Sequence, residues 1–273
     1  MDSRAQTIGQ LFVQVHQAGA AAAELALLRD AYLLGMQLYS GLFSGSGKTT
    51  LAHELGTASL AHRHGAGFDM IVAGMLHGAY IVGDWGHYRI RITGKKRAQL
   101  RSVIGASAEA YVYEYTQLAR DTESIARLAS RVGDLSARER DVIFLRLVEE
   151  LDRLLDYGAI LCFRQAEAMK AWLREQRDHL CRLAEQLGHP VLSSELAQAI
   201  DMTLAAELPA EFLGLAFPGD ASFRVVPRSY RRRRNLRAYQ RLAGYARRIE
   251  RELRRRMSMA PPAPAHVADL RRP

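Results

Sequence analysis

The sequence is poor in cysteine, with Cys162 and Cys181 as the two thiols among 273 residues. Two cysteines far apart exclude a disulfide framework and a pair of CxxC metal knuckles. The first ten residues lack a basic region followed by an apolar run, so we expect no secretory signal. Together these absences favour a reducing, cytoplasmic location.

Long hydrophobic runs are also missing. The longest apolar candidate, residues 70–82, is shorter than the roughly 20 residues that a helix needs to cross a bilayer, and it contains His77. We therefore expect a buried core helix in this segment. With 48% hydrophobic and 25% charged residues, the chain can bury a sizeable core in one or two domains.

Few segments alternate apolar and polar residues, which is the pattern typical of strands. Apolar residues instead recur at helical spacing in residues 8–15, 25–38, 51–60, 138–155 and 161–187. The sequence therefore predicts an all-α fold. We expect a helical domain over residues 1–160, a helical extension over 161–257, and a disordered proline-rich tail over 258–273.

Excess positive charge is absent from most of the chain. Residues 224–256 contain 14 arginines against two glutamates, a net charge of +12, and residues 257–273 add two arginines against one aspartate. The total is +9, so residues 1–223 carry a net charge of −4. Apolar residues at helical spacing between the arginines predict a basic amphipathic helix that binds nucleic acid or an anionic membrane surface. A packed helix with a solvated basic face is the alternative.

A complete phosphate-binding loop is lacking as well. Residues 45–50 read GSGKTT, like the second half of a Walker A motif, but Leu42 stands where the first glycine belongs. The segment before the loop reads as the end of a helix and not as a buried strand. We therefore expect no ATP or GTP binding and interpret these residues as a glycine-rich connection between helices.

Two of the nine histidines, His53 and His77, lie in segments dense in small and apolar residues. Their separation allows a helix, a glycine turn and a second antiparallel helix that bring both imidazoles together. Neutral imidazole binds divalent ions well, so the pair is a candidate metal site. For either histidine alone, a hydrogen-bonded core or surface residue is the alternative.

Three segments give the chain a resemblance to a known family. Residues 47–61 place His53 before a helix of small residues, AGMLHG stands at residues 73–78, and ELDRL stands at residues 150–154. Over residues 8–160 the chain resembles the HD-domain superfamily, and within it the (p)ppGpp hydrolase domain of the Rel/Spo stringent-response enzymes. The resemblance implies an HD-like helical bundle with the additional C-terminal helices outside it.

The resemblance also implies ligands for a divalent metal such as Mn, Fe or Zn. His53, His77 and Asp152 match the family's metal-binding positions, and Glu149 lies one turn before Asp152 on the same helix face. The implied activity is metal-dependent hydrolysis of a nucleotide or another phosphoester, so that a phosphorylated small molecule is the expected partner. The sequence leaves the catalytic residues and the oligomeric state open.

One part of the family's pattern is absent. Gly78 follows His77 where the family has the aspartate of its histidine-aspartate doublet. Asp84 and His87 lie shortly afterwards and are candidate replacements for that carboxylate. A domain that has lost hydrolysis, and that serves as a small-molecule sensor or as a binding module for a partner or polyanion, is the alternative function.

Overall fold

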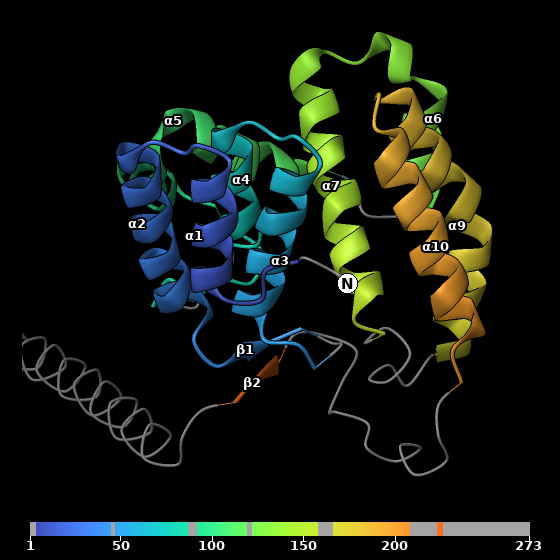
Figure 1. Ribbon diagram of the computed structural model, residues 1–273, viewed down its shortest axis with the longest axis horizontal. Helices are drawn as coiled ribbons and strands as arrows, with labels where there is room; N and C mark the ends of the chain where they lie inside the picture. Colours follow the sequence, from blue (N-terminus) through green and yellow to red (C-terminus); the bar gives the residue numbers. More distant parts are fainter. Residues whose placement is uncertain are drawn as a thin grey trace, which may run out of the picture. The chain divides into compact units, whose positions relative to one another are not determined.

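Figure 1 shows the computed structural model of the protein. The structure describes residues 4–44, 47–86, 92–118, 122–157, 166–207 and 223–225. All of them lie in Met1–Val225, the first of the two units into which the chain divides. Apart from Arg224 and Val225, the predicted basic helix and the predicted tail lie outside the described residues. Among the described residues, no helix has the length and apolar character needed to cross a membrane.

The described part of the chain has an all-α fold, which confirms the predicted fold class. The α-helices are α1 (Ile8–Gln17), α2 (Ala22–Tyr39), α3 (Thr50–Arg63), α4 (Phe68–Leu76), α5 (Gly94–Gln117), α6 (Thr122–Ser130), α7 (Ala137–Leu155), α9 (Ala166–Gln186) and α10 (Pro190–Ala205). A 3₁₀ turn at Val132–Asp134 precedes α7. The short strands β1 (Leu42–Phe43) and β2 (Phe223–Arg224) pair in antiparallel fashion, with Leu42 opposite Arg224.

The sequence specifies several of these helix starts through capping side chains. Thr7, Thr49, Thr93 and Ser136 each accept a hydrogen bond from a backbone N–H group in the first turn of the following helix. Such caps satisfy donors that have no partner within the helix. Pro190 begins α10, where its missing N–H group costs nothing.

Two apolar cores lie on either side of α7. Helices α1 to α5 supply the first core, and α6, α7, α9 and α10 supply most of the second (Figure 1). Leu60, Met70 and Tyr115 extend from α3, α4 and α5 into the second core. Helices α9 and α10, predicted as part of an extension, pack against α7. The core therefore continues across the predicted domain boundary at residue 160.

The buried segment at residues 70–82 differs from its prediction in one respect. Helix α4 ends at Leu76, with His77 as its C-cap, and the chain continues in turns. The helix stops because the Gly78 N–H group binds the Glu54 carboxylate, at 3.2 Å from Oε1. The segment is buried as expected, but the expected helix is too long.

A buried carboxylate fixes the bend in α5. The helix changes direction at Gly105, where φ is +81°, a conformation that favours glycine. Beyond the bend, the fully buried Glu109 accepts hydrogen bonds from Tyr80 (2.8 Å), Arg97 (2.6 Å) and Arg101 (2.7 Å). Burial raises the pKa of Glu109, but the hydrogen bonds from Arg97, Tyr80 and Arg101 outweigh it and hold the pKa below its usual range.

Candidate metal centre

The structure brings the two predicted histidines together. His53 lies in the first turn of α3 and His77 at the end of α4, and a short turn joins these helices. The ring centroids are 5.2 Å apart and the ring planes are inclined by 77°. Small residues permit this approach, since a Cβ atom on Gly74 would lie only 3.1 Å from the Cα atom of Ala58.

Glu149 of α7 completes a group of three metal-ligating side chains. Its Oε1 atom lies 3.7 Å from His53 Nε2 and 3.9 Å from His77 Nε2. Each of the three residues offers a ligand atom, and these atoms all lie within 4.8 Å of one another. Ligands about 2.1 Å from one tetrahedral ion lie about 3.4 Å apart, so the group needs only a small contraction to hold a metal.

Both histidine rings are oriented by acceptors at their other nitrogen. His53 Nδ1 lies 2.7 Å from Asp152 Oδ2, while His77 Nδ1 lies 2.7 Å from the Gly74 carbonyl and 3.0 Å from Glu54 Oε2. A proton on Nδ1 satisfies these acceptors and leaves the Nε2 lone pair facing Glu149. Metal-ligating histidines are commonly held in this way. The donor set therefore fits a divalent ion.

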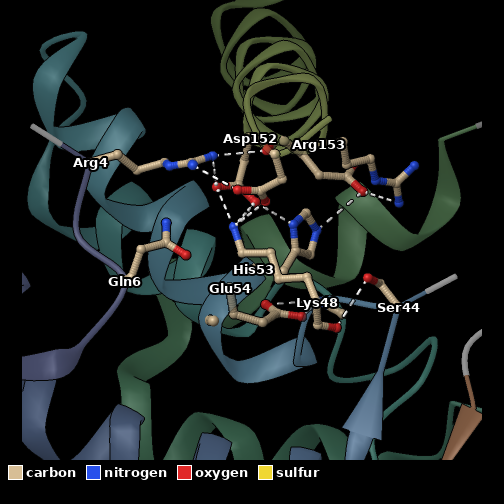
Figure 2. Close-up of polar contacts among 12 residues, drawn as sticks. Arg4, Gln6, Ser44, Lys48, His53, Glu54, Asp152 and Arg153 are labelled. Carbon is tan, nitrogen blue, oxygen red and sulfur yellow. Dashed lines mark hydrogen bonds and ion pairs between the residues drawn. The ribbon is translucent and has the colours of Figure 1, made fainter. Parts of the chain in front are cut away.

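Asp152, predicted as a ligand, lies outside this group of three and contacts His53 from the other side of the ring. Its carboxylate also binds Arg4 Nη1 and Lys48 Nζ, both at 3.0 Å, as Figure 2 shows. Lys48 and Arg4 reach Asp156 as well, at 2.7 and 2.8 Å. The lysine of the Walker-like stretch is thus paired with carboxylates of α7.

Charges around His53 and Asp152 stabilise their ionised forms. Burial alone would lower the pKa of His53, but hydrogen bonds to Asp152 and Glu149 outweigh it and raise the pKa to about 9. Burial raises the pKa of Asp152, whereas the hydrogen bond to His53 and the charges of Lys48 and Arg4 together lower it. The cluster therefore balances several buried charges against one another.

Gly56 allows Asp152 to reach His53. A Cβ atom at residue 56 would lie 2.0 Å from Asp152 Oδ1, far inside van der Waals contact. Gly56 is buried in α3, so the carboxylate of α7 packs directly over the α3 backbone. A glycine at residue 56 is thus required for α7 to approach α3 this closely.

Glu54 fills the space that the absent side chain at residue 78 would occupy. A Cβ atom on Gly78 would lie 2.3 Å from Glu54 Oε1. Glu54 is 1% exposed and contacts both the Gly78 N–H group and His77 Nδ1. The hydroxyl of Tyr39 lies in the same region, and burial followed by the charge of Glu54 raises its pKa well above the usual value. A carboxylate therefore lies beside His77, but it comes from α3.

Three further side chains contact the carboxylate of Glu149. The Tyr115 hydroxyl donates to Oε2, Arg146 Nη1 lies 3.2 Å from Oε2, and Arg153 Nη2 lies 2.5 Å from Oε1. Burial raises the pKa of Glu149, but the charges of Arg153 and Arg146 and the hydrogen bond with His53 hold it well below its usual range. Glu149 is therefore an ionised carboxylate, as a metal ligand must be.

Among the described residues, Asp84 does not join this group. Asp84 Oδ1 accepts a hydrogen bond from the Gly86 N–H group within its own turn, and His87 lies outside the described residues. His64 pairs with Glu195, and His189 packs on Phe144 with ring centroids 4.3 Å apart. His64 and His189 thus take part in contacts away from the group of three.

Sequence reasoning missed several residues of the site. Glu54 and Arg153 lie within the segments at residues 47–61 and 150–154 but were given no role, and Tyr115 and Arg4 lie outside all three segments that carry the resemblance. The sequence did hold one hint of Glu54. A carboxylate directly after His53 can fill the space left by a glycine directly after His77. The N-terminal position of Arg4 gave no signal.

Part of the chain matches a family of known proteins. The family described as "Domain of unknown function (DUF6817)" matches residues 37–120. This part contains His53, Glu54, His77 and Tyr115, and it ends before α7 and therefore before Glu149. No curated protein matches the chain.

Proposed function

We propose that this protein is a divalent-metal-dependent hydrolase that acts on a phosphoester. The observation that carries the proposal is the convergence of His53 Nε2, His77 Nε2 and Glu149 Oε1, with each Nδ1 atom facing an acceptor. The resemblance of residues 8–160 to the HD-domain superfamily supports the same class of chemistry. A metal ion bound there, such as Mn, Fe or Zn, would polarise a phosphoryl oxygen and lower the pKa of a bound water.

The chain's own residues have separate roles in this proposal. His53, His77 and Glu149 hold the ion, and two histidines with one carboxylate leave positions open for water and substrate. Asp152 fixes the ring of His53, while Glu54 and the Gly74 carbonyl fix that of His77. Tyr115 orients Glu149 through its hydroxyl. Loss of a hydrogen-bond partner of a metal ligand typically lowers metal affinity about 10-fold to 100-fold.

Measurement of bound metal tests the proposal directly. We expect near-stoichiometric Mn, Fe or Zn in the purified protein by elemental mass spectrometry, lost in His53→Ala, His77→Ala and Glu149→Gln. His16→Ala is the matched control, because His16 is exposed on α1. The metal-loaded protein should then hydrolyse a generic aryl phosphate or phosphodiester. Absence of metal after incubation with all three ions would overturn the proposal.

A helical binding domain without turnover is the second candidate. The burial of the site favours it, since His53, His77 and Glu149 are 8%, 3% and 1% exposed. In that case the metal or a small molecule would be sensed and not used for hydrolysis. Stoichiometric metal without turnover in a broad phosphoester screen would select this second function.

A further inference from the structure

Arg153 reaches the same carboxylate oxygen that faces both histidines. Its Nη2 atom lies 2.5 Å from Glu149 Oε1, and that oxygen is also the atom nearest to His53 Nε2 and His77 Nε2. In Figure 2 Arg153 and Arg4 lie on opposite sides of the cluster around His53. A cation on the Arg153 side chain is thus adjacent to the proposed metal position.

Arg153 differs in exposure from the groups that it meets. Its side chain is 45% exposed, whereas those of Glu149, His77 and His53 are 1%, 3% and 10% exposed. The Arg153 side chain therefore extends from the exposed surface of α7 to the buried cluster.

The other nearby cations have different surroundings. Arg146 is 17% exposed and is shared between Glu149 and Glu150, each at 3.2 Å. Arg4 and Lys48 are each bound by two carboxylates and lie on the Nδ1 side of His53, away from Glu149. Among the described residues, Arg153 is thus the exposed cation next to the ligand oxygen.

We propose that Arg153 is the residue that binds the phosphate group of the substrate next to the metal centre. A divalent ion would neutralise Glu149 and so weaken the ion pair that now holds the guanidinium. The planar guanidinium can then bind two phosphate oxygens in parallel, which lysine cannot do. This inference rests on the proposed function, and it names the residue that would select a phosphorylated substrate.

An ordinary structural role makes a different prediction. Glu149 and Arg153 are four residues apart on α7, and such pairs typically shift a helix equilibrium by no more than about twofold. A purely structural pair would change stability or metal retention slightly. It would leave the affinity of the metal-loaded protein for phosphate unchanged.

The test measures metal affinity and phosphate affinity separately in the full chain. Wild type, Arg153→Gln and Arg153→Lys are loaded with Mn²⁺, and inorganic phosphate is then titrated by calorimetry. We expect Arg153→Gln to retain Mn²⁺ within about threefold and to bind phosphate about tenfold to a hundredfold more weakly. Arg153→Lys should be intermediate, because it keeps the charge and loses the paired donors.

Arg177→Gln is the matched control, since Arg177 is 35% exposed and pairs with Asp201 at 2.7 Å on other helices. It should leave both affinities unchanged. If Arg153→Gln does not fold, Arg153→Met is measured in its place, because methionine keeps part of the aliphatic stem. Unchanged phosphate affinity in an Mn²⁺-loaded Arg153 variant would overturn this inference alone. Loss of Mn²⁺ from an Arg153 variant would have the same consequence. Wild type that binds Mn²⁺ without phosphate would also overturn it, whereas wild type without Mn²⁺ would overturn the proposed function and this inference together.

Discussion

Glu54 and Gly78 should behave as a coupled pair. In Gly78→Ala, the new Cβ atom would lie 2.3 Å from Glu54 Oε1, so the buried carboxylate must move away from His77 and from the residue 78 N–H group. Overpacking of a core costs about 1–3 kcal/mol. Loss of a hydrogen bond to a charged group adds about 1.5–3 kcal/mol. We therefore expect Gly78→Ala to lower the free energy of unfolding by about 2.5–6 kcal/mol.

The same substitution should cost much less once the carboxylate is removed. In Glu54→Ala the obstructing oxygen is gone, and the Val82 side chain at 3.3 Å is the remaining close neighbour of the new methyl group. A double-mutant cycle measured by urea unfolding should give a coupling energy of about 2 kcal/mol. Gly9→Ala is the control, since Gly9 lies in α1 with open space around it, and it should stabilise the protein slightly. Additive effects of the two changes, within about 0.5 kcal/mol, would refute this account of Glu54.

Three further predictions concern α7 and α5. Gly56→Ala should destabilise the protein by about 2–4 kcal/mol in urea unfolding, because its Cβ atom would displace the buried Asp152; an effect below 0.5 kcal/mol would contradict the packing described above. Asp152→Asn should weaken metal binding about 10-fold to 100-fold in competition with a chelator, whereas Glu149→Gln should remove it, and equal losses would contradict the separate roles of these two carboxylates. Glu109 has a lowered pKa, so its contribution to stability is present above its unfolded pKa of about 4.3 and is lost as the pH falls through the folded value. Unfolding free energies between pH 6 and 3 should therefore fall less steeply in Glu109→Gln than in wild type, and identical slopes would refute the assignment.

The helices could be predicted from the sequence because their signals are local. The apolar spacing of residues 51–60 and 138–155 corresponds to α3 and α7, and hydroxyl residues mark their starts. The end of α4 could not be predicted, since it depends on a contact between Gly78 and Glu54 that the sequence does not show. The spacing of apolar residues along the chain does not show which buried polar group will replace a hydrogen bond within the helix.

The site was predictable to the extent that its residues follow a recognisable pattern. His53, His77 and Glu149 were all named from spacing and resemblance, and the structure brings them together. The resemblance pointed to Asp152 as the ligand with Glu149 beside it, whereas the group of three contains Glu149, and Asp152 contacts the Nδ1 side of His53. The role of Arg153 could not be predicted although it lies in the ELDRL segment, since an arginine four residues after a glutamate is usual on any exposed helix surface.

The position of α7 between two apolar cores has a mechanical consequence. Its Glu149 belongs to the same group as His53 and His77, which come from helices on one side, while its opposite face packs on α9 and α10. A metal held by these three residues would link the consecutive helices α3 and α4 to α7, which is distant in the chain. At 100 times its dissociation constant it would add about 2.7 kcal/mol to stability. Loss of the metal would weaken the contact of α7 with α3 and α4 before either core unfolds.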